Sequence, residues 1–121
     1  MARILIIEDN PTNMKLAVLL LQREGHEVLE ATDAEAGIRL AREHLPQLIL
    51  MDVQLPGMDG LAATRLLRAD AATSDIKIVA LTALAMNGDR ERVAAAGCDG
   101  YIAKPFHYKE FLKVVAEMVA A

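Results

Sequence analysis

The chain has 121 residues, of which 54% are hydrophobic and 25% are charged, a composition that excludes a disordered or solvating sequence. This length suits one domain with a substantial core, so residues 1–121 are expected to form a single domain. Thirteen basic and seventeen acidic side chains give a net charge of −4, and only 3% of residues are aromatic. These values argue against a generally basic nucleic-acid-binding protein and against an aromatic platform for single-stranded bases.

Short apolar runs without polar alternation occur at intervals along the chain. They predict strands at 4–7, 48–51, 78–81 and 101–103, with 27–30 as a fifth candidate near a sheet edge. Unbroken apolar runs are typical of parallel strands that are covered on both faces. The sequence therefore favours a parallel sheet that lies between layers of helices.

Stretches with helical periodicity separate these runs. Apolar residues recur three and four positions apart over 14–21, 34–41, 63–67 and 108–119. Asn10 supplies a capping side chain before a first-turn proline, Pro11, and both Gly25 and Gly97 lie where a helix-ending glycine is expected. Because strand and helix alternate about five times, we expect a doubly wound α/β domain with helices on both faces of its sheet.

The sequence contains no targeting segment and no pair of cysteines, and both facts bear on where the protein is expected to act. The first apolar run stops at Glu8, which makes it too short for a secretory signal or a membrane span. The single cysteine, Cys98, cannot form an internal disulfide, and no Cys or His grouping has metal-ligand spacing. We expect a cytoplasmic protein that does not insert into membranes. Because no linker follows the last helix, we also expect a free-standing protein without an output domain.

Polar or charged residues follow the expected strands that share one edge of the sheet. They are Glu8 and Asp9, Asp52, Thr82, and Lys104-Pro105. Ligands of such sheets bind beyond the carboxyl ends of the strands. Two unit charges about 4 Å apart repel by roughly 4 kcal/mol at an effective dielectric constant near 20, so a cluster of three carboxylates is expected to hold a cation. Hard oxygen ligands suit Mg²⁺.

These residue types also predict the chemistry of the edge. Asp52 can act as a nucleophile on a phosphoryl group beside the metal. Lys104 can meet the phosphoryl oxygens with a compact positive charge, and Thr82 can donate its hydroxyl to them. The small side chain of Ala83 would let the backbone N–H approach the phosphoryl group closely. Read singly, each residue also has an ordinary interpretation: the acids as solvated loop or capping residues, Asp52 as the start of a turn.

Together these residues resemble the signature of the response-regulator receiver family, of which CheY is a single-domain member. The resemblance covers essentially the whole chain. The stretches Leu81–Met86 and Tyr101–Pro105 are similar to those of DivK-type single-domain regulators and of the receivers in hybrid histidine kinases. The family's flavodoxin-like, CheY-like fold implies a five-stranded parallel sheet in the order 2-1-3-4-5.

The resemblance assigns a role to each matching position. Asp52 would be the phosphoacceptor. Asp9 would bind Mg²⁺ directly, together with Asp52 and the backbone carbonyl of Gln54, and Glu8 would bind it through a water molecule. Glu8 stands where many members have aspartate, and this longer side chain leaves Asp9 as the firmer ligand.

The remaining positions concern the phosphoryl group and the signal. Thr82 and Lys104 would contact the phosphoryl group, Ala83 would provide backbone support, and Pro105 would follow a cis peptide bond. Tyr101 matches the aromatic switch position, although it also fits an ordinary half-buried strand residue. The implied donor is a sensor histidine kinase or a histidine phosphotransfer protein. The implied output is a protein target, or a phosphorylation-dependent dimer, on the face formed by the fourth helix, fifth strand and fifth helix.

In this signalling role the protein is not an enzyme acting on other substrates, and the sequence also bears on two alternative functions. An aspartyl-phosphate phosphatase or mutase would usually carry a second aspartate two residues after the nucleophile, where this chain has Gln54. The chain is also short for a substrate-enclosing cap. A flavin- or dinucleotide-binding module lacks support because no G-x-G-x-x-G or G-x-x-x-x-G-K-[ST] motif occurs.

Overall fold

The computed structural model describes residues 2–83 and 87–120. In this part of the chain five strands alternate with five helices. The strands are β1 (Arg3–Ile7), β2 (Glu27–Ala31), β3 (Leu48–Asp52), β4 (Lys77–Thr82) and β5 (Gly100–Ala103). The helices are α1 (Pro11–Arg23), α2 (Ala34–His44), α3 (Gly60–Ala69), α4 (Asn87–Ala95) and α5 (Tyr108–Ala120).

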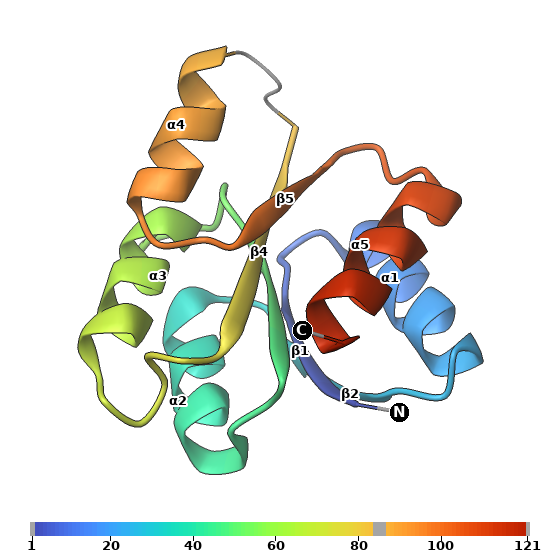
Figure 1. The fold of residues 1–121 in the computed structure, drawn as a ribbon, viewed down its shortest axis with the longest axis horizontal. Coiled ribbons are helices and arrows are strands. Elements are labelled where there is room, and N and C mark those ends of the chain that lie inside the picture. Colours follow the sequence, from blue (N-terminus) through green and yellow to red (C-terminus); the bar gives the residue numbers. More distant parts are fainter. Residues whose placement is uncertain (1, 84–86, 121) are drawn as a thin grey trace.

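The strands form one parallel sheet in the order β2-β1-β3-β4-β5. The helices cover both faces of this sheet, with α1 and α5 on one side and α2, α3 and α4 on the other (Figure 1). The doubly wound α/β fold and the strand order expected from the resemblance are therefore confirmed.

Alternate residues of each inner strand supply two separate cores. Ile4 and Ile6 of β1 pack with α1 and α5, whereas Leu5 and Ile7 pack with α2 and α3. All four of these side chains are fully buried. This pattern is what the unbroken apolar runs predicted, because a strand covered on both faces has no polar side to present.

The helices begin at the residues that local chemistry favours. The side chain of Asn10 accepts a hydrogen bond from the Asn13 N–H (3.0 Å), and Pro11 takes the first position of α1. Asp33 and Asp59 cap α2 and α3 in the same way. Each cap satisfies an N–H that has no partner within its helix. Gly25 follows α1 with a positive φ of 84°, as the expected helix-ending glycine would.

The strands extend further than the apolar runs. Asp52 and Thr82, expected just beyond their strands, are the last residues of β3 and β4, where they pair with Leu81 and Ala103. The reason is that the ladder is made by main-chain groups, which continue to pair after the side chains become polar. The third helix likewise begins at Gly60, earlier than its apolar spacing indicated. Residues 84–86, part of one stretch that carried the resemblance, lie outside the described residues.

Candidate functional site

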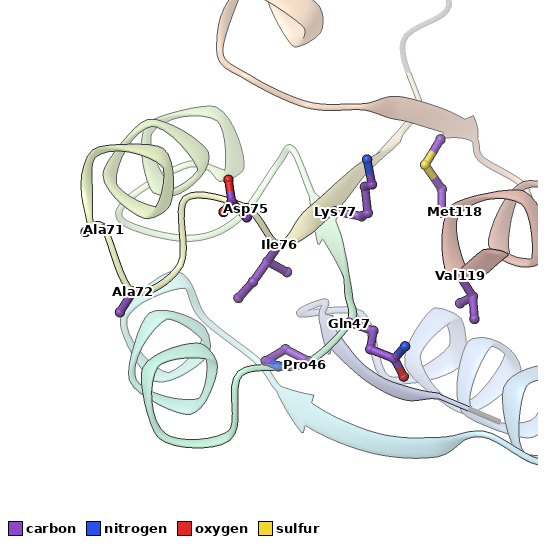
Figure 2. A pocket seen from close by; sticks show the side chains of 9 residues that line it. All are labelled: Pro46, Gln47, Ala71, Ala72, Asp75, Ile76, Lys77, Met118 and Val119. Atoms are coloured by element: carbon purple, nitrogen blue, oxygen red, sulfur yellow. The ribbon is translucent and has the colours of Figure 1, made fainter. Parts of the chain in front are cut away.

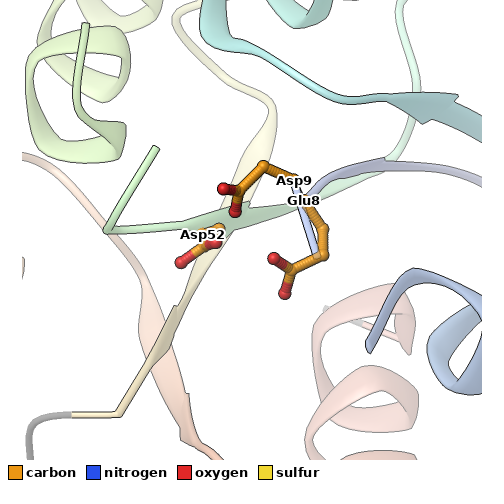
Figure 3. A group of neighbouring side chains, drawn as sticks. All are labelled: Glu8, Asp9 and Asp52. Atoms are coloured by element: carbon orange, nitrogen blue, oxygen red, sulfur yellow. The ribbon is translucent and has the colours of Figure 1, made fainter. Parts of the chain in front are cut away.

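Three carboxylates meet at the carboxyl edge of the sheet. Asp52 ends β3, and Glu8 and Asp9 directly follow β1, the strand beside it. One oxygen from each carboxylate lies within 4.8 Å of the others, and Figure 3 shows the three side chains gathered at this edge. The sequence predicted this group from strand ends alone, and the parallel pairing of β1 with β3 brings it together.

Lys104 provides the positive charge of the site. It follows β5, and its Nζ lies 2.6 Å from Glu8 Oε1 and 3.2 Å from Asp52 Oδ2. Glu8 and Asp52 are only 1% and 3% exposed, so this ammonium reaches two carboxylates that solvent does not screen. Asp9 is exposed. The site is thus a buried charge cluster with one solvent-facing carboxylate at its mouth.

Main-chain groups fix the two buried carboxylates. The Asn10 N–H donates to Glu8 Oε2 (3.2 Å), and the Gln54 N–H donates to Asp52 Oδ1 (3.0 Å). Both donors lie two residues beyond the carboxylate that they bind, in the turns that follow β1 and β3. The orientation of Glu8 and Asp52 is therefore set locally, by the turn immediately after each strand.

The electrostatics of the cluster favour proton uptake by Asp52. Burial, a side-chain hydrogen bond with Glu8 and the charge of Glu8 raise the pKa of Asp52 to about 7, against the opposing effects of Lys104 and the Gln54 N–H. A cation held by these carboxylates would favour the ionised form, because a nearby positive charge stabilises a carboxylate. Metal binding at this cluster would therefore be linked to loss of the proton from Asp52.

The donor set fits a hard divalent cation. All three side chains offer carboxylate oxygens, the ligands that Mg²⁺ prefers. Glu8 Oε1 is fully buried and lies 2.6 Å from Lys104 Nζ, and a carboxylate oxygen has a second lone pair beyond that contact. A buried acceptor of this kind can bind a further donor, such as a metal-bound water molecule.

Thr82 and Lys104 are tied together through the main chain. Thr82 is buried at the end of β4, and its carbonyl accepts a hydrogen bond from the Lys104 N–H (2.8 Å). The Lys104–Pro105 peptide bond is cis, in agreement with the expectation from the resemblance. Ala83 follows Thr82 and is exposed. The hydroxyl and the ammonium that the sequence singled out thus arise from neighbouring strand ends.

Tyr101, on β5, lies beside α4. Its half-buried ring packs against a small apolar cluster formed by α3, α4 and β4, and the guanidinium carbon of Arg90 lies 5.1 Å from the ring centroid. This neighbour was missed because α4 has no apolar periodicity that would fix which side of it faces β5.

Two cavities help to delimit the site. One of about 270 Å³ borders it and is lined by Gln54 and Thr82 on one side and by Asp89 and Arg92 of α4 on the other. Another, of about 310 Å³, lies at the opposite edge of the sheet, where Gln47 precedes β3 and Lys77 begins β4 (Figure 2). The first follows directly on Asp52 in the chain, since Val53 and Gln54 line it, whereas the second lies where the strands begin.

A doubly wound domain with an acidic cluster and a lysine at this edge has the architecture of a phosphoacceptor signalling domain. The family model described as response regulator receiver domain matches residues 4–116, and the chain belongs to this family. It is a response regulator receiver of two-component signalling. Among the described residues, no helix has both the length and the apolar character needed to cross a bilayer.

Individual relatives agree with this assignment. The chain is 42% identical over 112 residues to the polar-differentiation response regulator DivK of Brucella anthropi. The matched region covers 93% of this chain and 91% of DivK. The receiver domain of sensor histidine kinase PA1611 from Pseudomonas aeruginosa is 37% identical to this chain. The two structures superpose with a TM-score of 0.92, over 99% of this chain and 98% of that domain. The PA1611 structure holds a magnesium ion coordinated in its active-site cleft. A putative response regulator from Chloroflexus aurantiacus is 30% identical with a TM-score of 0.95, again over 99% and 98%.

Proposed function

We propose that Asp52 accepts a phosphoryl group from a phosphohistidine of a sensor histidine kinase or a histidine phosphotransfer protein. The observation that supports this most directly is the Asp52 carboxylate itself, 3.2 Å from Lys104 Nζ and within one acidic cluster with Glu8 and Asp9. A nucleophilic oxygen, a compact cation and a set of metal ligands are the parts that phosphoryl transfer requires.

The metal ligands in this proposal are those that the resemblance implied. The carboxylates of Asp9 and Asp52 and the backbone carbonyl of Gln54 would hold Mg²⁺ directly, and Glu8 would reach it through water. Bound there, Mg²⁺ would neutralise charge on the phosphoryl oxygens. The buried Glu8 Oε1 supports the water-mediated role because it has acceptor capacity left over.

The reaction needs few further groups from the chain. An Asp52 oxygen forms a bond to phosphorus while the P–N bond breaks, and the electron pair of that bond stays with the imidazole. The imidazole leaves in its neutral form when its other nitrogen already carries a proton, so no general acid is required. Lys104 would stabilise charge on the equatorial oxygens, and Thr82, with the backbone at Ala83, would donate hydrogen bonds to them.

The output follows from the new charge at this edge. Phosphorylation adds acceptor oxygens near Thr82. If Thr82 moves toward them, Tyr101 can turn inward, and the face formed by α4, β5 and α5 changes shape for a protein target or a second copy of the chain. Residues 1–121 would act as one cytoplasmic receiver domain that promotes only its own phosphorylation and dephosphorylation. The half-buried Tyr101 beside α4 supports this route.

The test is phosphorylation by a small phosphodonor with Mg²⁺. The wild-type protein should acquire one label that is lost in the Asp52→Asn variant, as measured by intact-protein mass spectrometry. The Lys104→Ala variant should still bind Mg²⁺ and take up label while losing the conformational change. Labelling of the Asp52→Asn variant at the wild-type rate would refute the role given to Asp52, and equal loss of metal affinity in Lys104→Ala would refute the role given to Lys104.

A further inference from the structure

The first turn of α3 lies against the main chain of Asp52. α3 begins at Gly60, whose N–H donates to the carbonyl of Val53 (3.0 Å). A Cβ added at Gly60 would overlap the backbone carbonyl oxygen of Asp52, lie 2.9 Å from its carbonyl carbon and lie 3.0 Å from Met51 Cγ. The helix therefore approaches Asp52 more closely than any residue with a side chain allows.

Neither side of this contact can yield easily. β3 is an inner strand that pairs with β1 and β4, and the Val53 N–H extends that pairing to the carbonyl of Leu81 (3.0 Å). On the helix side, the carbonyl of Gly60 accepts a hydrogen bond from the buried hydroxyl of Thr64 (2.8 Å). A methyl group at position 60 would meet main-chain atoms, which cannot rotate away as the end of a side chain can.

The strain would fall on the carboxylate of Asp52. That carboxylate is held by two short contacts, from the Gln54 N–H to Oδ1 (3.0 Å) and from Lys104 Nζ to Oδ2 (3.2 Å). Relief of the overlap requires the main chain at 52–53 or the first turn of α3 to shift, and a displacement of about 1 Å at a reacting group can cost on the order of 100-fold in rate. The backbone of Gln54, next in the chain, would move with it.

We propose that Gly60 is a positioning residue for the phosphoryl transfer: the missing side chain lets α3 support the Asp52 main chain in the place from which its carboxylate meets Gln54, Lys104 and the metal ligands. This inference rests on the proposed role of Asp52. It assigns to the sequence Asp59-Gly60 two separate tasks, since Asp59 caps α3 and Gly60 sets the distance between α3 and β3.

The chain offers a matched control in Gly37. It is also buried within the first turns of a helix, α2, and a Cβ there would also be too close to a neighbour, 2.6 Å from Ile7 Cγ1. That neighbour is the side chain of Ile7 rather than main chain, so the overlap disturbs packing between α2 and β1 and does not meet the Asp52 backbone. Gly60→Ala and Gly37→Ala therefore each add one methyl group to a buried glycine near the start of a helix, but only the first presses on the main chain of Asp52.

The experiment measures phosphorylation rate, Mg²⁺ affinity and the Gln54 amide resonance by NMR in both variants. Gly60→Ala should slow phosphorylation by a small phosphodonor about 10- to 100-fold, weaken Mg²⁺ binding and shift the Gln54 amide signal. Gly37→Ala should stay within about two-fold of the wild type in rate and affinity, even if both variants unfold at lower temperature. Wild-type behaviour of Gly60→Ala, or equal losses in the two variants, would overturn the inference.

A second pair of variants covers the case in which Gly60→Ala does not fold. Thr64→Val removes the hydroxyl that holds the Gly60 carbonyl, whereas Thr73→Val removes a similarly buried hydroxyl that donates to the carbonyl of Leu67 (2.6 Å). Thr64→Val should slow phosphorylation several-fold and Thr73→Val should not; equal rates in the two would overturn the inference. If the wild type takes no label, the proposed function of Asp52 fails, and the Mg²⁺ affinities and Gln54 signals alone decide whether Gly60 positions Asp52.

Discussion

The layer between the sheet and helices α1 and α5 differs sharply from the carboxyl edge and the adjoining helix α4. The α1/α5 layer is built from buried apolar side chains of β1, β3, β4 and β5 and of both helices, with Phe111 fully buried and its ring centroid 5.2 Å from that of Phe106. The carboxyl edge buries Glu8 and Asp52 beside Lys104. Beside it, α4 contributes Val93 to a small cluster in which the described part of the chain buries four residues.

The α1/α5 layer therefore contributes mainly to stability, whereas the carboxyl edge and α4 carry the proposed function. Burial of apolar side chains provides most of the favourable free energy of folding, and in this chain much of it comes from the α1/α5 layer. Buried charges cost free energy when they are not fully paired, and among the residues of α4 whose burial the structure describes only Val93 is buried. The region that carries the proposed chemistry and switch is therefore the one that can change with the least loss of packing.

The largest expected effect tests this comparison directly. Phe111→Ala should lower the free energy of unfolding by about 3–5 kcal/mol, because it opens a cavity in a well-packed layer. Val93→Ala should lower it by about 1–2 kcal/mol, since it removes fewer atoms from a smaller cluster. Urea denaturation measures both values, and amide hydrogen exchange should show the effect of Val93→Ala concentrated in α4. Equal losses in the two variants would contradict the comparison.

An intermediate effect of opposite sign is expected at the charge cluster. The pKa of Asp52 is raised to about 7, so the folded protein binds a proton more tightly than the unfolded chain. The resulting stabilisation is complete below about pH 4 and is lost as the pH rises through about 7. With a metal chelator present, Asp52→Asn should therefore be more stable than the wild type at pH 8, by about 1–2 kcal/mol.

Thermal unfolding of both proteins from pH 5 to pH 8 checks this expectation. The wild type should lose stability over this range relative to Asp52→Asn, and added Mg²⁺ should restore it at pH 8 because binding to the folded state stabilises that state. Parallel pH profiles for the two proteins would show that Asp52 does not hold the proton.

The smallest effect is expected at the opposite edge of the sheet, where His26 ties β1 to the turn before β2. His26 Nδ1 accepts a hydrogen bond from the Ala2 N–H (3.1 Å), and burial lowers the pKa of His26 below 6.5, against a raising effect of Glu24. Its contribution is present above pH 6.5 and is lost as the pH falls through the lowered pKa. His26→Gln should thus cost about 0.5 kcal/mol at pH 7.5 and less at pH 5, and an NMR titration of His26 should show the lowered pKa directly. A titration at or above pH 6.5 would contradict the assignment.

Much of the fold could be predicted from local patterns. The strands and helices followed from apolar periodicity, and the caps at Asn10 and Gly25 from residue type. The site residues followed because the carboxyl ends of parallel strands meet at one edge. The ends of the strands were harder to predict. Asp52 and Thr82 belong to β3 and β4 because main-chain pairing continues beyond the apolar residues. No local pattern indicates that Arg90 faces Tyr101.

The sequence by itself determined the sheet, the layers of helices and the residue types at the edge, because these depend on burial and on hydrogen bonds between near neighbours in the chain. Only the tertiary structure decided how close Glu8, Asp52 and Lys104 lie, why the pKa of Asp52 is raised and why position 60 has no room for a side chain. Those properties depend on contacts between segments far apart in the chain, at distances that a shift of about 1 Å would change.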